Sequence, residues 1–148
     1  MSLYSFGGAP ASVATPLSLL VTGLLSQTPI PTTLTNSTQV DVSGRKWVDF
    51  LIDVSGNGGG TPSTQLDGYV ECSEDGSTWR RITVEEVAAG SGDATQYDYH
   101  WIRAFSGATF NTVLTVPVTA LYMRLVVKGN ATPDGASTLA VDAVLRSV

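Results

Sequence analysis

The stretch that decides the fold is LYMRLVVKG, residues 121–129, followed after a polar connection by STLAVDAVLRSV, residues 137–148. In both segments apolar and other side chains alternate. A period of two places every second side chain on the same face of a strand, so each segment predicts a strand with one buried face. The first buried face is Leu121, Met123, Leu125 and Val127, and the second is Leu139, Val141, Ala143 and Leu145. Two such strands need a second sheet to cover their apolar side.

The chain upstream supplies more segments of the same kind. The pattern predicts a strand over residues 46–54, with Val48, Phe50, Ile52 and Val54 facing inward and Asp49 and Asp53 outward. Residues 66–73 and 79–84 predict a hairpin because the connecting EDGS, residues 74–77, is strong turn chemistry. Further strands are expected over residues 97–105 and 110–117, and the first strand quoted above is expected to begin at residue 119 and run to 128. About eight strands at this spacing predict an all-β, jelly-roll-like β-sandwich with an extended N-terminal arm.

Composition and charge exclude several classes of function. The 148 residues carry a net charge of −5, and a nucleic-acid binder would instead show a basic face. Only 14% of the residues are charged, which indicates either that a partner covers part of the surface or that the surroundings are crowded. Cys72 is the one cysteine and His100 the one histidine, so neither an intrachain disulfide nor a Cys/His zinc site is expected. We expect no metal and no cofactor, and a reducing cytoplasm as the place of assembly.

The first 40 residues contain no charged side chain and hold four of the seven prolines. This shift in composition predicts two parts, an arm over residues 1–38 and a β-sandwich domain over residues 39–148. We expect no signal peptide, because no basic residue precedes the apolar run 17–25, and no membrane span, which takes about 20 residues. Thr15 and Pro16 are compatible with the start of a short helix, and the alternation of Leu17, Leu19 and Val21 is equally compatible with a strand.

The arm carries apolar side chains that need covering, because exposed apolar surface costs about 25 cal/mol per Å². It is therefore predicted to be the main assembly element, docked either on a neighbouring subunit or on its own domain. The predicted partner-binding residues are Leu3, Tyr4, Phe6, Leu17, Leu20, Val21, Leu24, Leu25 and Ile30.

The segment GYVECSEDGSTW, residues 68–79, resembles the galactose-binding-like, discoidin-type jelly rolls, in which a strand often ends in Ser-x-Asp-Gly-x-x-Trp. The later segments 121–125 and 139–145 are similar to the last strands of that family. An apolar arm ahead of a small acidic β-sandwich also resembles bacteriophage head-decoration (cement) proteins. That resemblance implies oligomers on the capsid, often trimers, with arms that bridge subunits. The chain lacks the flanking cysteine pair of the discoidin-type lectins.

Candidate sites in the remaining sequence are few. No activated serine context such as G-x-S-x-G accompanies His100, so we expect no enzyme. Asp49 and Asp53, with Asp41 or Glu71, are candidates for calcium, but a solvated face is expected because calcium needs six to eight oxygens. Trp79 is expected to close one end of the core. Tyr97, Tyr99, Trp101 and Arg103 share one strand face, which suits a core, a protein interface or a sugar-stacking site.

The sequence thus predicts a non-enzymatic virion structural protein of a bacteriophage, which decorates the capsid through its arm and an oligomeric β-sandwich. Its expected partners are other virion proteins, the major capsid protein first, and further copies of itself, with neither nucleic acid nor membrane. The alternative is a carbohydrate-binding module of a tail, a baseplate or another surface protein.

Overall fold

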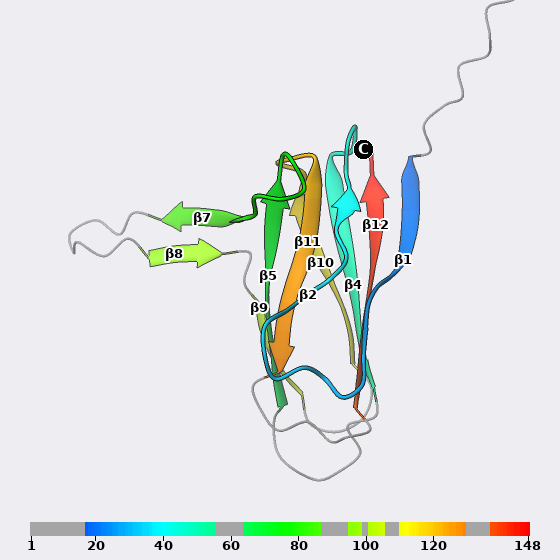
Figure 1. Ribbon diagram of the computed structural model, residues 1–148, viewed down its shortest axis with the longest axis vertical. Helices are drawn as coiled ribbons and strands as arrows, with labels where there is room; N and C mark the ends of the chain where they lie inside the picture. The colour runs from blue at the N-terminus through cyan, green and yellow to red at the C-terminus, as the bar shows by residue number, and fades with distance from the viewer. Residues whose placement is uncertain (1–16, 56–63, 87–94, 99–100, 106–109, 130–136) are drawn as a thin grey trace, which may run out of the picture.

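The computed structural model describes residues 17–55, 64–86, 95–98, 101–105, 110–129 and 137–148. In these ranges every regular element is a β-strand, and two antiparallel sheets pack face to face as a β-sandwich (Figure 1). The all-β sandwich predicted from the sequence is confirmed, and the finer jelly-roll assignment stays a prediction. The same ranges contain no helix that is long and apolar enough to cross a membrane.

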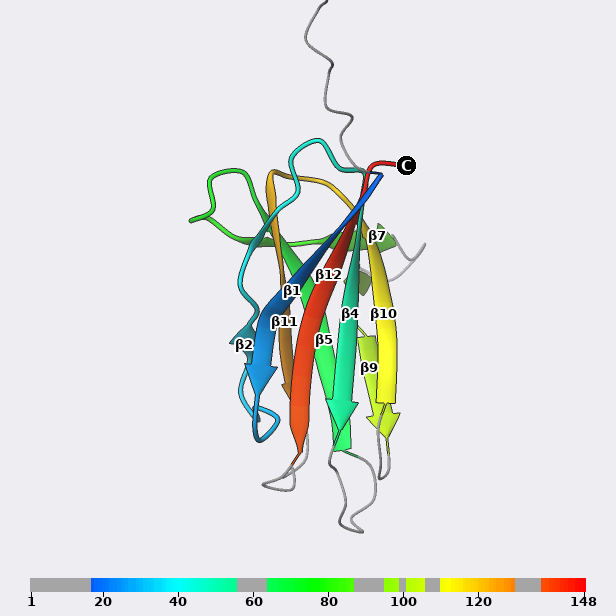
Figure 2. The same ribbon diagram turned by 90° about the vertical axis from the view of Figure 1, so that its right-hand side faces the viewer.

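The first sheet, sheet A, contains four long strands in the order β1-β12-β4-β10, seen face-on in Figure 2. Their bounds are Ser18–Gln27 for β1, Thr138–Arg146 for β12, Trp47–Ser55 for β4 and Phe110–Pro117 for β10. The predicted strand 46–54 therefore lies between β12 and β10. It pairs with β12 over its whole length, with Ile52 opposite Val141.

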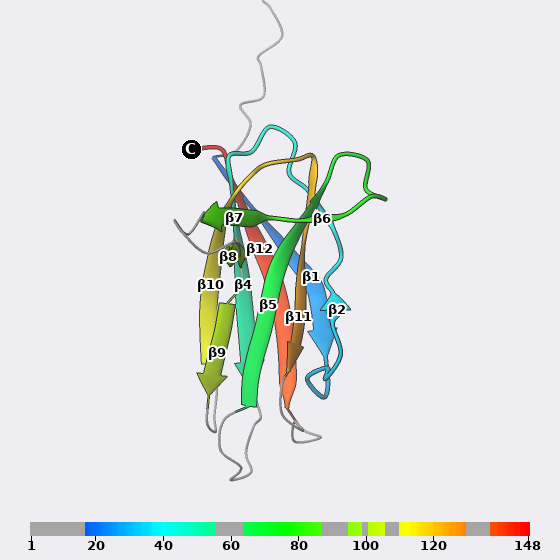
Figure 3. The ribbon, with the colours of Figure 1, turned by 90° about the vertical axis from the view of Figure 1, so that its left-hand side faces the viewer.

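The second sheet, sheet B, is built around β11 and β5 and faces the viewer in Figure 3. β11 pairs with β5 on one side and with the short strands β2 and β3 on the other, while β5 also pairs with β6 and β9. The bounds are Thr35–Asn36 for β2, Val40–Asp41 for β3, Thr64–Ser73 for β5, Arg80–Arg81 for β6, Trp101–Phe105 for β9 and Tyr122–Gly129 for β11. A separate ribbon of β7 (Thr83–Glu86) and β8 (Thr95–Asp98) projects from this side (Figure 1).

The core lies between the sheets and consists of the alternating residues that the sequence predicts. Val48, Phe50, Ile52 and Val54 of β4 are fully buried, as are Met123, Leu125 and Val127 of β11 in the opposite sheet. Leu139, Val141, Ala143 and Leu145 of β12 complete the sheet A side. Leu121 is an exception: it precedes β11 and is exposed.

The structure differs from the sequence prediction in the N-terminal segment. Residues 18–27 form β1 and residues 35–36 form β2, so the described part of the predicted arm belongs to the sandwich. The sequence is compatible with a short helix or a strand in this segment, and the structure has the strand. Leu24, Leu25 and Ile30 are buried in the core of their own chain, which removes apolar surface from water without a second molecule. In this part of the chain, the boundary between residues 38 and 39 does not separate an arm from a domain.

Two other predicted strands are divided between sheets. The predicted strand 79–84 pairs with β5 only as far as Ile82, whose N–H donates to the carbonyl of Val70 at 3.0 Å, and the chain then leaves as β7. The predicted strand 97–105 is likewise two strands, since β8 pairs with β7 and β9 pairs with β5. Alternation of side chains cannot reveal such a change of partner, because both strands keep a period of two.

Candidate binding surfaces

β1 is an edge strand whose path is set by a bulge at Gly23. Val21 lies opposite Ala143 and Leu25 opposite Val141, so three residues of β1 face the single residue Asp142. Gly23 adopts a positive φ of 72°, which a glycine reaches without strain, and its N–H donates to Asp142 Oδ1 at 2.6 Å. The bulge breaks the alternation, and Leu24 and Leu25 are therefore both buried.

The first half of β1 places leucines in solvent. Leu17, Leu19 and Leu20 are all exposed, whereas Val21 packs partly against the core. Of the predicted partner-binding residues, Leu17 and Leu20 are therefore available to a partner, and Leu24, Leu25 and Ile30 are not. Leu3, Tyr4 and Phe6 lie outside the described residues.

The backbone of this half of β1 also has an open side. Ser147 N–H donates to the carbonyl of Leu17 at 3.0 Å, so this carbonyl points toward β12. Hydrogen-bonding groups alternate in direction along an antiparallel strand, and those of Ser18 and Leu20 therefore point away from β12. Lower down the strand, Thr38 N–H donates to the carbonyl of Leu24 at 2.7 Å and closes the edge there. In the described residues the open edge is therefore limited to the region before the bulge.

The outer face of sheet A is the first candidate surface, and Figure 2 shows the four strands that form it. It carries exposed Leu20, Trp47 and Val113, one from each of three strands. Its charges are partly neutralised: Arg146 Nη2 donates to Asp49 Oδ1 at 2.8 Å, and Thr115 Oγ1 donates to the same oxygen at 2.7 Å. The face thus combines exposed apolar side chains with aspartates, of which Asp49 is held by Arg146 and Thr115, and Asp142 accepts from Gly23 N–H.

The outer face of sheet B has a different chemistry. Arg124 of β11 donates from Nε to Glu71 Oε2 at 2.8 Å, and its guanidinium carbon lies 4.0 Å from the ring centre of Trp79. Arg81 lies 3.6 Å above the ring centre of Tyr69 in the same way. Arg124, Glu71 and Arg81 form one cross-strand row. Cation–π stacking holds these planar groups in place on the outer face of the sheet.

Trp79 was predicted to close one end of the core, and this prediction is wrong. Its ring is half-buried and stacks on Arg124 on the outer side of sheet B. The alternation of Arg124 with Leu125 predicts that Arg124 faces outward, as it does. The sequence did not show that Trp79, in the turn region beyond β5, would fold back over Arg124.

The turn between β5 and β6 is held by a hydrogen-bond network centred on Asp75. Its Oδ1 accepts from Thr78 N–H at 2.7 Å, from Ser77 N–H at 2.8 Å and from the Ser73 hydroxyl at 2.9 Å. These bonds, with those of the Thr78 and Ser77 amides first, hold the pKa of Asp75 well below its usual range. The hydroxyl and backbone amide of Ser43 lower the pKa of Asp41 in a similar turn. Both aspartates shape turns.

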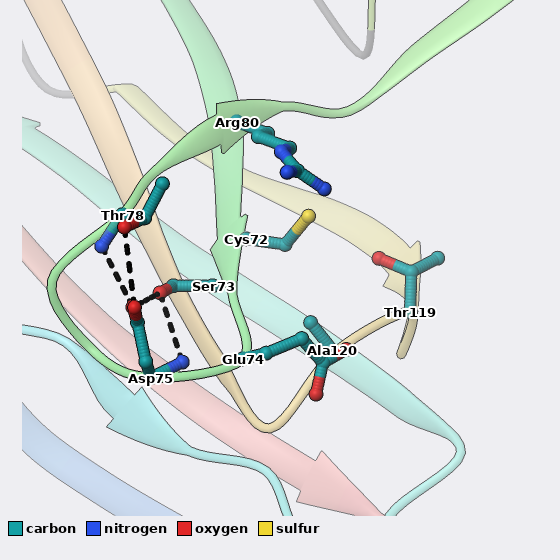
Figure 4. A pocket seen from close by; sticks show the side chains of 8 residues that line it. All are labelled: Cys72, Ser73, Glu74, Asp75, Thr78, Arg80, Thr119 and Ala120. Carbon is teal, nitrogen blue, oxygen red and sulfur yellow. Dashed lines mark hydrogen bonds between the residues drawn. The ribbon is translucent and has the colours of Figure 1, made fainter.

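Beside this turn is a pocket of about 310 Å³ (Figure 4). Its lining includes Cys72, Arg80 and Thr119, and Figure 4 shows the Cys72 thiol between the side chains of the other two. The volume is at the lower end for ligand sites, and one guanidinium with a thiol and a hydroxyl suits only a small polar group. Asp75 and Thr78 also line it, but they bond to each other within the turn.

The other predicted sites are dispersed or lie outside the described side chains. The backbones of Tyr97, Trp101 and Arg103 belong to β8 and β9, but Tyr99 and all four side chains lie outside the described part. The candidate calcium set is divided, because Asp49 bonds to Arg146 and Glu71 to Arg124 in opposite sheets. Within the described residues no three His, Cys, Asp or Glu side chains gather as a metal site. No protein-family model matches the chain, and no curated protein is similar enough to count as a relative.

Proposed function

We propose that this protein is a non-enzymatic structural component of a bacteriophage virion that decorates the capsid, with the major capsid protein as its partner. The observation that carries the proposal is the outer face of sheet A, where Leu20, Trp47 and Val113 leave apolar surface in solvent. Exposed apolar side chains spread over several strands of a sheet face fit another protein surface better than they fit a small molecule, which needs a concave site.

Energetics support the same role. A few side chains at the centre of an interface, Trp, Tyr and Arg above all, supply most of its binding energy, while charged pairs at its exposed rim contribute little. On sheet A, Asp49 is already paired with Arg146, so covering it leaves no unpaired carboxylate behind. The net charge of −5 favours solubility of the free protein.

The test uses capsids assembled from the major capsid protein of the phage that the proposal implies. Replacing Trp47 and Val113 by serine should reduce the amount of protein bound to gradient-purified capsids by about tenfold or more, since each 1.4 kcal/mol of binding energy is worth a factor of ten. The matched control replaces Leu34 and Leu121 by serine. These two are 52% and 44% exposed, against 40% and 56% for Trp47 and Val113. Equal binding of both variants, or no binding of the unmodified protein, would contradict the proposal.

The second candidate is a carbohydrate-binding module, which the Trp79–Arg124 and Tyr69–Arg81 stacks on sheet B favour. Aromatic rings next to hydrogen-bonding arginines are the groups that recognise sugar rings. One face of each ring is already covered by a guanidinium, however, which leaves a smaller stacking area. A glycan array decides between the two functions: sugar binding that is lost in Trp79→Ala or Trp101→Ala, with capsid binding absent, would select the carbohydrate-binding module.

A further inference from the structure

We infer that the open edge of β1 pairs with the β1 strand of a second copy, so that two sheets A join into one eight-stranded antiparallel sheet about a two-fold axis. This pairing uses a different surface from the one proposed to bind the capsid, and it can be tested on the purified protein without capsids. The pairing would form at the edge of β1 before the bulge, where the backbone groups of Ser18 and Leu20 point away from β12.

Within the described residues, this edge lacks the usual protection against strand pairing. Native proteins guard exposed edges with charged side chains, prolines, short strands or a covering segment. In sheet B, the edge strand β6 is two residues long and consists of Arg80 and Arg81, and the opposite edge is divided into β2 and β3. β1 has ten residues and no charge, and its bulge lies beyond Val21. An unguarded apolar edge of this kind is a site for strand addition.

The positions of the open groups favour a second β1 as the occupant. A two-fold axis through Leu20 pairs each Leu20 with its counterpart through two backbone hydrogen bonds. It also places Leu19 opposite Val21 of the partner on the inner face, where Leu19 is exposed in the single copy. Leu20 meets its counterpart on the outer face. The match is self-complementary, as an isologous interface requires.

Electrostatics are compatible with this pairing. Each copy carries a net charge of −5, so two copies can approach closely only through a neutral surface. Residues 17–27 contain no charged side chain. The contact is short, which places it among the weak interfaces of under about 1,200 Å², and its strength should depend on protein concentration. On a capsid, where copies are held close together, a weak contact of this type is sufficient.

Cross-linking tests the axis directly. In a Cys72→Ser background, Leu20→Cys should form a disulfide-linked dimer under mild oxidation, because Cα atoms of a directly opposed hydrogen-bonded pair lie about 5.5 Å apart, within disulfide range. The matched control is Val113→Cys on β10, at the other edge of sheet A. Leu20 is 57% exposed and Val113 is 56% exposed. The control should remain monomeric under the same conditions.

Two results would overturn the inference: equal cross-linking of both variants, or cross-linking only when the Leu20→Cys and Val113→Cys proteins are mixed. The second result would indicate head-to-tail pairing of β1 with β10, as in a ring. A reversible readout comes from sedimentation of Leu20→Asp, which opposes two carboxylates at the axis and should raise the dimer dissociation constant about tenfold or more. Val113→Asp should leave that constant unchanged, and equal values for the two variants would contradict the pairing.

Discussion

At the scale of single residues, Asp75 organises an exposed turn through hydrogen bonds rather than through buried apolar side chains. The backbone amides of Ser77 and Thr78 have no strand partners, and one carboxylate oxygen accepts both of them. Ser73 Oγ donates to the same carboxylate and accepts from Gly76 N–H at 3.0 Å. Gly76 has a positive φ of 70°, which suits glycine in such a tight turn. The sequence alone identified this turn, because Asp and Gly act through near neighbours.

The Asp75 carboxylate should make stability depend on pH. Its pKa in the folded protein lies below the unfolded value of about 3.9, so its contribution is complete above that value and is lost as the pH falls toward the folded pKa. Asp75→Asn should therefore lower the melting temperature at pH 7, and the difference from the unmodified protein should shrink below about pH 4. Thermal melts between these pH values measure the effect. Glu74→Gln, beside the network but not in it, should show no such trend, and a pH-independent difference for Asp75→Asn would refute the role.

At the scale of secondary-structure elements, β1 combines two functions in one strand. Its second half buries Leu24 and Leu25 and is tied to Thr38, whereas its first half presents leucines and open backbone groups. The bulge at Gly23 separates the two halves, since it shifts which residues face the core. Sequence reasoning correctly found that this segment needed apolar cover. The sequence does not show whether the chain's own sheets or another molecule cover these apolar side chains, because both arrangements bury the same residues.

The structure predicts the result of removing the first 38 residues. Deleting residues 1–38 removes Leu24, Leu25 and Ile30 from the core, and each buried side chain contributes about 1.5–3 kcal/mol. The total is a large share of the 5–15 kcal/mol that is typical of a domain, so the truncated chain should lose cooperative unfolding. Circular dichroism melts provide the measurement, and a stable 39–148 fragment would show that β1 is dispensable.

At the scale of the whole molecule, the two sheets differ in what they offer to partners. Sheet A presents apolar side chains and the open edge of β1, and sheet B presents arginines stacked on aromatic rings (Figures 2 and 3). The C-terminus lies beside the start of β1, where Ser147 bonds to Leu17. Pairing through β1 would therefore bring two apolar outer faces into one continuous surface. Such a dimer would present two copies of the same outer face to a capsid.

The sequence by itself determined where most strands of the sandwich lie and which side chains they bury. Phe110–Pro117 is a strand as predicted, and the inward residues of β4 and β12 are the predicted ones. This succeeds because side-chain alternation and turn chemistry depend on neighbours within a few residues. Only the tertiary structure decided that 121–129 and 137–148 lie in different sheets, that β1 joins β12, and that Trp79 stacks on Arg124. Those outcomes depend on hydrogen-bond partners and packing between distant segments, which a local period does not encode.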